Sequence, residues 1–130
     1  MTSLRKVVVT GMGVVSPVGK NLDEFWESLK TGKNGIAPIS SFDTTEFKAK
    51  LAAEVKDFDP REYMEKADML RSDRFAQLGL AAAVQAVEQS GIEGTIEPER
   101  IGVYFGTGIG GIQTMSNEQE KLSARGPRKV

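Results

Sequence analysis

Residues 73–90 limit what this chain can fold into more than any other segment. Apolar side chains occupy most of its positions, and only Gln77 and Gln85 are polar in its middle. Gly91 follows and is typical of a helix end, so the pattern predicts a helix over residues 73–90. A helix that is apolar nearly all round belongs inside a layered structure, because a surface helix needs one polar face. We therefore expect this helix to be buried.

Short apolar runs on either side of this helix predict strands. Residues 6–10 and 101–105 are rich in β-branched and aromatic side chains, which favours strands buried on both faces. A capped helix is expected from residue 22 to Gly32, a short strand at 51–55, and a polar helix at 112–124. This alternation predicts an α/β sheet with right-handed crossovers, with no internal boundary within residues 1–130.

The composition removes most familiar catalytic sites. The 130 residues include no cysteine and no histidine, and the net charge is -1. Thiolate zinc sites, cysteine nucleophiles, imidazole bases and the Ser-His-Asp triad are therefore excluded within this chain, and we expect no metal and no cofactor. The balanced charge argues against nucleic-acid binding. No run approaches the roughly 20 apolar residues of a membrane span, so we expect a cytoplasmic protein.

Two glycine clusters each follow a predicted strand. In residues 11–16, Ser16 stands where a dinucleotide-binding fingerprint has its third glycine, so we favour a tight turn over a nucleotide site. In residues 106–111, the place beyond a strand end favours a ligand pocket. Ile109, between Gly108 and Gly110, then either lines that pocket or faces the core. Spacing alone leaves these two alternatives open.

The last ten residues carry four basic side chains and no acidic one. Gly126 and Pro127 force an irregular path there, and the basic tail as a whole is suited to receive an acidic partner. A solvated charged face is the simpler alternative. No pair of carboxylates has a spacing that indicates an acid and a base.

Several motifs together resemble the beginning of a β-ketoacyl-acyl carrier protein synthase. Their order and spacing match that family over the whole chain, and residues 16–19 together with Ile109 resemble its synthase II branch. The motifs are residues 5–19, 32–36, 41–44, 106–111 and 126–129.

The resemblance implies a thiolase-like fold of two similar halves, each a mixed sheet covered by helices, in a homodimer. It implies fatty acid chain elongation by decarboxylative Claisen condensation, with acyl carrier protein as partner and acyl and malonyl thioesters as substrates. Gly108, Ile109 and Gly110 are then expected at the acyl-binding site. Arg128 and Lys129 are expected at the carrier-protein surface, with Arg71 and Arg74 as a second pair.

The chain departs from a complete synthase in one respect. The family's nucleophilic cysteine, two catalytic histidines and supporting lysine lie beyond the motif that ends at Lys129, so no residue here inherits a catalytic role. We therefore expect an N-terminal fragment, an incomplete domain that is inactive alone. A non-catalytic synthase-like subunit, such as a chain-length factor, and a separate carrier-protein-binding module remain alternatives.

Overall fold

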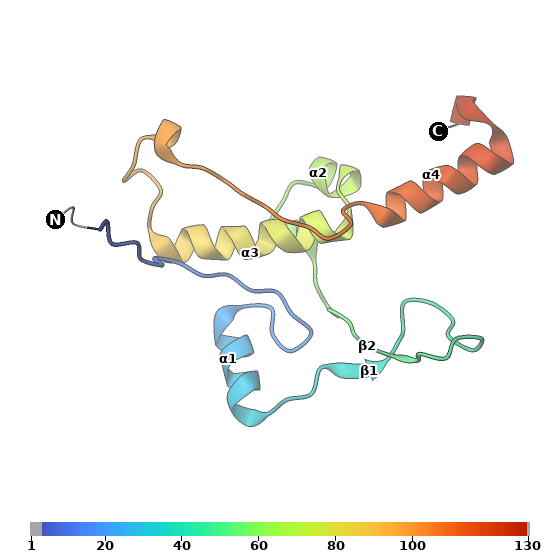
Figure 1. Ribbon diagram of the computed structural model, residues 1–130, viewed down its shortest axis with the longest axis horizontal. Coiled ribbons are helices and arrows are strands. Elements are labelled where there is room, and N and C mark those ends of the chain that lie inside the picture. Colours follow the sequence, from blue (N-terminus) through green and yellow to red (C-terminus); the bar gives the residue numbers. More distant parts are fainter. Residues whose placement is uncertain (1–3, 130) are drawn as a thin grey trace.

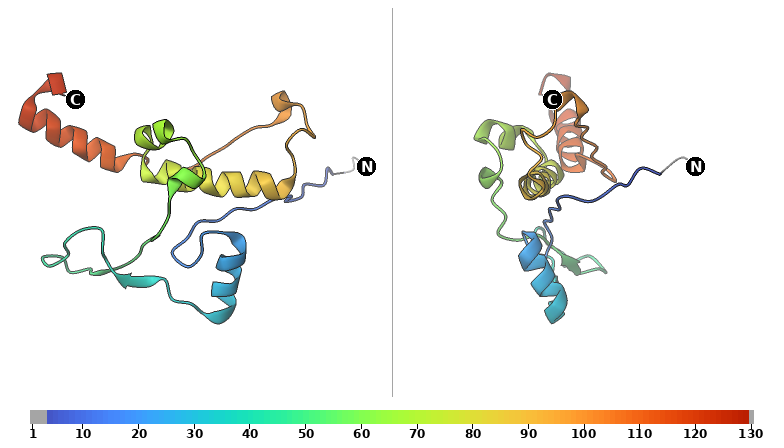
Figure 2. Two further views of the ribbon diagram at one scale, coloured as in Figure 1. Left: turned by 180° about the vertical axis from the view of Figure 1, so that it is seen from behind. Right: turned by 90° about the vertical axis from the view of Figure 1, so that its left-hand side faces the viewer.

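The computed structural model describes residues 4–129, arranged around one long helix, α3 (Arg74–Ser90). The N-terminal segment and the segment before α4 run along α3, whereas α1 and the two strands lie to one side of it (Figures 1 and 2). The helix predicted at residues 73–90 is confirmed. It ends at Gly91, which has the left-handed φ of 59° and donates its N–H to the carbonyl of Glu88.

Helix α1 (Leu22–Thr31) begins and ends as its sequence predicts. The Asn21 side chain accepts the N–H of Glu24, and Gly32 ends the helix at a φ of 67°. The Glu24 carboxylate accepts the N–H of Lys20 at 2.9 Å, one residue earlier than in the usual capping box. This contact ties the helix start to the turn before it.

Strands β1 (Ile36–Pro38) and β2 (Leu51–Ala53) form an antiparallel pair in which Ala37 faces Ala52. The strand predicted at residues 51–55 is therefore confirmed over its first part. The other helices are α2 (Lys66–Arg71) and α4 (Ile112–Arg125), and the latter confirms the polar helix predicted near the C-terminus. Single 3-10 turns occur at Pro60–Glu62, Pro98–Arg100 and Pro127–Lys129.

The N-terminal segment lies directly on α3 because two of its residues are glycines. A β-carbon on Gly13 would overlap the carbonyl oxygen of Ala82, and Gly11 meets the carbonyl of Ala86 in the same way. Two glutamines of α3 bind the backbone of this segment. Gln89 accepts the N–H of Met12 at 2.7 Å, and Gln85 accepts that of Val14 at 3.2 Å. The tight turn expected in residues 11–16 lies slightly later, at residues 16–19.

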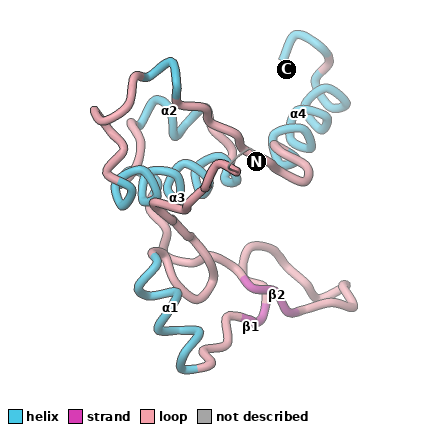
Figure 3. Tube along the Cα trace, turned by 60° about the vertical axis from the view of Figure 1, so that its left-hand side comes forward, coloured by secondary structure: helices cyan, strands magenta, loops and turns pink. Residues whose placement is uncertain are grey.

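The strands predicted at residues 6–10 and 101–105 are not formed within the described part of the chain. Both segments are extended but unpaired, and the only ladder among residues 4–129 joins β1 to β2, as Figure 3 shows. Their side chains are exposed, with Val8 at 74% and Val103 at 81%. A strand needs a neighbouring strand whose backbone N–H and C=O groups bond to its own. Helix α3, which lies beside both segments, cannot form such a ladder. For the same reason, residues 4–129 do not form the predicted crossover topology.

Helix α3 is less buried than its sequence predicts. Ala81 is its one fully buried residue, while Leu80 and Val87 remain more than 40% exposed. Phe105 covers part of it, since a β-carbon on Gly79 would lie 2.6 Å from the Phe105 ring. The protein exposes 11040 Å², whereas a compact monomer of this length would expose roughly 6,700 Å². Much apolar surface is thus available for further chain to cover.

This exposed surface predicts how the 130-residue chain behaves when it is made alone. We expect it to associate and to exchange its amide hydrogens quickly, because unpaired extended segments and apolar side chains lie at its surface. Sedimentation velocity combined with hydrogen exchange measures both properties. A monodisperse monomer with slow exchange throughout α3 would contradict this expectation.

Candidate functional site

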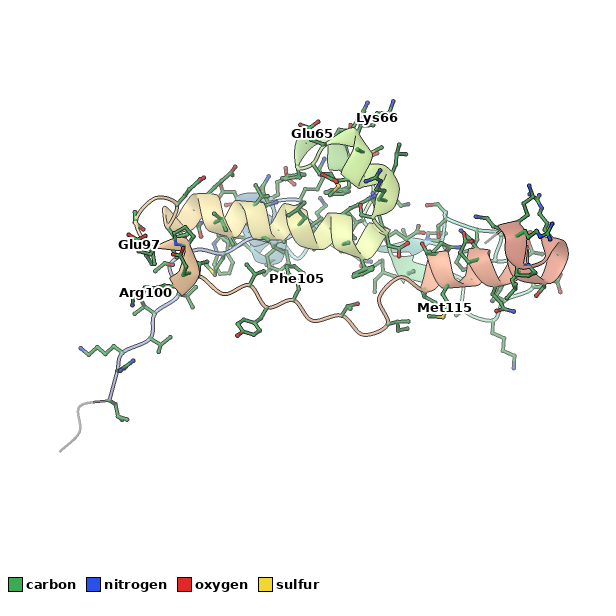
Figure 4. The ribbon with its side chains drawn as sticks, turned by 90° about the horizontal axis from the view of Figure 1, so that it is seen from above. Glu65, Lys66, Glu97, Arg100, Phe105 and Met115 are labelled. Carbon is green, nitrogen blue, oxygen red and sulfur yellow. The ribbon has the colours of Figure 1, made fainter. Side chains whose placement is uncertain are left out.

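Residues 106–111 form a loop where the extended segment along α3 turns into α4 (Figure 4). Gly110 has a φ of 77° and donates its N–H to the Thr107 hydroxyl at 3.1 Å. An L-residue with a side chain would be strained at that φ. Gly106 and Gly108 have open space where a side chain would lie. The hydrogen bond therefore closes a turn over residues 107–110, and open space lies beside Gly106 and Gly108.

Ile109 projects from the open part of this loop and is 71% exposed. The described residues therefore leave most of this side chain uncovered. An apolar side chain between two glycines costs free energy when it meets water, and it gains if an apolar ligand or further chain covers it. This position is compatible with a pocket wall.

An apolar groove of about 260 Å³ lies along α3, beside the extended segment that leads into the loop. Its lining is entirely hydrocarbon and comes from α3 and from the segment before the loop: Phe75, Ala76, Leu80, Ala83, Val103 and Phe105. A smaller hollow of about 150 Å³ lies where the loop meets the start of α3, lined in part by Arg74 and Gly110. Hydrocarbon surfaces of this kind bind apolar chains and exclude charged groups.

Asp73 joins the loop to α3. Its carboxylate accepts the Thr114 hydroxyl at 2.6 Å and lies against Gly111, where a β-carbon would overlap the Asp73 Oδ2 atom. No local pattern predicts this contact, since Asp73 resembles an ordinary helix cap and Thr114 lies 41 positions further along the chain. Asp73 makes no side-chain capping bond to α3.

The predicted basic residues lie in two places. Arg128 and Lys129 are exposed in the 3-10 turn beyond α4, at the end of that helix farther from α3 (Figure 1). Arg71 is exposed at the end of α2. Arg74 lies 4.7 Å from the Phe58 ring centroid and donates to the carbonyl oxygens of Phe58 and Val55 at 3.4 Å each. Arg74 therefore holds the segment before α2 against α3.

The carboxylates do not form an acid–base pair. Hydrogen bonds from Ser41 and Ser40 lower the pKa of Glu54 to about 2, and those from Arg61 lower the pKa of Asp59 to about 2. Both groups are therefore ionised at neutral pH and satisfied by their own neighbours. Residues 4–129 contain no cluster of acidic side chains that could hold a metal ion.

A cleft of about 280 Å³ between residues 16–20, 33–37 and 54–57 was not predicted, because it joins three segments far apart in the sequence. Three lysines and three carboxylates line it, so its charge is balanced. Lys20 donates to the carbonyl of Asp57 at 3.1 Å, and Lys56 lies 4.0 Å from Glu54. These contacts favour a structural role over anion binding. No helix of the described chain is long and apolar enough to cross a bilayer.

Comparison with known proteins gives a consistent match across the chain. Residues 4–130 match the family described as beta-ketoacyl synthase, N-terminal domain. The chain is 47% identical over 129 residues to 3-oxoacyl-acyl-carrier-protein synthase 2 of Vibrio cholerae, covering 98% of this chain and 31% of that protein. The enzyme of the same name from Staphylococcus aureus strain COL is 37% identical over 131 residues, with 100% of this chain and 32% of that protein covered. The chain thus spans about a third of the length of these relatives.

Solved structures agree on the fold. The ishigamide ketosynthase/chain length factor matches with a TM-score of 0.75 and 30% identity, over 95% of this chain and 31% of that one. A ketosynthase in complex with a type II PKS acyl-carrier protein matches with the same TM-score and 23% identity, over 95% of this chain and 32% of that one. The layered α/β fold predicted from the sequence is therefore confirmed, although its sheet is not formed in the described residues.

Proposed function

Since the chain belongs to the β-ketoacyl synthase family and has its thiolase-like α/β fold, we propose that it is the N-terminal part of a 3-oxoacyl-acyl-carrier-protein synthase that elongates fatty acids. The observation that carries this proposal is the 47% identity over 129 residues to a relative of that name, which includes the loop at residues 106–111. The complete protein would act as a homodimer, with residues 1–130 inside its N-terminal domain.

The proposed reaction proceeds in two steps. An acyl group moves from the carrier thioester to an enzyme thiolate, which releases the carrier thiol. Malonyl thioester then loses carbon dioxide, and its enolate attacks the acyl carbonyl and expels the thiolate. Because these 130 residues contain no cysteine and no histidine, the nucleophile and the donors that stabilise the enolate come from other parts of the protein. The chain alone is then inactive.

Within this proposal, residues 108–110 form part of the acyl-binding site. Ile109 lies between two glycines and is exposed next to a loop end that is fixed at Gly110. An isoleucine on such a loop occupies the acyl pocket or withdraws from it, and this movement controls which chain lengths enter. Neither Gly108 nor Gly110 hinders the movement by a side chain.

A chain-length factor is the second candidate, because one matched structure carries that description. Such a subunit would share the fold and lack a nucleophile. Incubation of the full-length protein with acyl-carrier protein, followed by intact-mass measurement, distinguishes the two. A covalent acyl adduct and a β-ketoacyl product support the synthase, whereas the absence of both under conditions that acylate a Vibrio cholerae synthase 2 control favours the chain-length factor.

The pocket role of Ile109 predicts a chain-length effect. In the full-length protein, Ile109→Phe should slow acylation by long acyl chains and leave short ones nearly unchanged, since added volume in a confined apolar site costs roughly 1 to 3 kcal/mol. Acylation rates against chain length, together with the melting temperature, measure this. Ile96→Phe makes the same change away from the loop and serves as the control. An unaltered length profile for Ile109→Phe would refute the gate.

Carrier-protein binding predicts a salt-dependent effect at the other end of the chain. Reversing the charge of Arg128 and Lys129 together should slow association with acyl-carrier protein by about tenfold at low salt, because like charges then face an acidic partner. Arg71→Glu should have a smaller effect. Lys48→Glu, also exposed but in the loop between β1 and β2, is the control. If the association rate and its dependence on ionic strength stay the same, these residues are only a solvated surface.

A further inference from the structure

The carboxylate of Asp73 lies between the N-terminal ends of two helices. It precedes α3, and it contacts the first turn of α4 through the Thr114 hydroxyl at 2.6 Å. Negative charge is stabilised near helix N-termini, because unpaired N–H groups there carry partial positive charge. The two residues are 41 positions apart in the sequence, so their hydrogen bond closes a long segment that contains the whole Ile109 loop.

Asp73 does not behave as a simple helix cap. It occupies the N-cap position of α3 without a side-chain bond to that helix, and Gly111 occupies the N-cap position of α4, also without one. The carboxylate instead accepts a hydrogen bond across the gap between the helices. The Asp73 side chain therefore does not cap α3. Its hydrogen bond to the Thr114 hydroxyl connects α3 to α4 instead.

Gly111 is part of the same contact. A β-carbon at this position would overlap Asp73 Oδ2, so the carboxylate approaches the backbone of the loop end only because residue 111 has no side chain. The next residue toward the loop, Gly110, has a φ of 77° and binds Thr107. Gly106 and Gly108, in contrast, meet nothing within 4 Å. The Ile109 loop is therefore anchored at its C-terminal end, and open space surrounds Gly106 and Gly108.

We infer that Asp73 and Thr114 are positioning residues for the Ile109 loop: their hydrogen bond fixes the C-terminal hinge about which Ile109 moves. This inference rests on the proposed function, in which Ile109 controls entry to the acyl pocket. A fixed hinge restricts the places that Ile109 can occupy, and that restriction makes the gate selective. Neither residue touches substrate in this account, and both act through the loop.

The test uses the full-length protein and its acylation rates over a series of acyl chain lengths. Thr114→Val keeps the side-chain shape but removes the hydroxyl that Asp73 accepts. We expect it to flatten the chain-length profile by roughly fivefold in the ratio of long-chain to short-chain rates, since one charge-assisted hydrogen bond is lost. Thr114→Ser retains the hydroxyl and should retain the profile. Thr114→Ala, a second variant without the hydroxyl, should reproduce the flattened profile.

A purely structural role gives different results. If Thr114→Val and Thr114→Ala lower the rates for all chain lengths by one factor, or if Thr114→Ser flattens the profile as they do, the positioning role is refuted. Ile109→Phe measured in parallel separates this inference from the gate itself. When Ile109→Phe alters the profile but Thr114→Val and Thr114→Ala do not, the gate stands and the anchor fails. When Ile109→Phe also leaves it unaltered, both are refuted.

Discussion

The contact between the N-terminal segment and α3 is the interaction on which the arrangement of this chain depends. Gly11 and Gly13 let the backbone reach the carbonyl oxygens of the helix, and Gln85 binds this segment at Val14 and, through its other amide atom, the carbonyl of Lys20 at 2.8 Å. The turn that leads into α1 is thereby placed against α3. On another part of the same helix, Gly79 receives the Phe105 ring. Glycines at these contacts thus allow two extended segments to lie along one helix.

The position of the candidate site follows from the packing of these segments along α3. Because residues 101–105 run along α3, the loop that follows them arrives at the N-terminal end of that helix, where Asp73 meets it. The apolar groove, the exposed Ile109 and the Asp73–Thr114 hydrogen bond therefore all lie toward the N-terminal half of α3. Under the proposed function, this part of the chain shapes the acyl pocket, and the nucleophile comes from elsewhere in the protein, because residues 1–130 contain no cysteine.

Local signals predicted the local structure well. Asn21 and Gly32 mark the ends of α1, and Gly91 marks the end of α3, because caps act through neighbouring backbone groups. The strand predictions for residues 6–10 and 101–105 are wrong for the described residues. Strand pairing needs a partner strand, and a local sequence pattern does not show whether one is present. The Asp73–Thr114 contact joins residues 41 positions apart and had no local signal at all. The family resemblance includes both glycine clusters. It does not predict that Gly11 and Gly13 of the first cluster pack against the backbone of α3.

Hydrogen exchange on the full-length protein carrying Gly13→Ala tests the central claim most directly. The added β-carbon would overlap Ala82 O, so the N-terminal segment should lift from α3, and the N–H groups of Met12 and Val14 should exchange much faster than in the unmodified protein. Gly106→Ala, where the structure leaves open space, should leave both unchanged. Equal protection of Met12 and Val14 in the two variants would contradict the account.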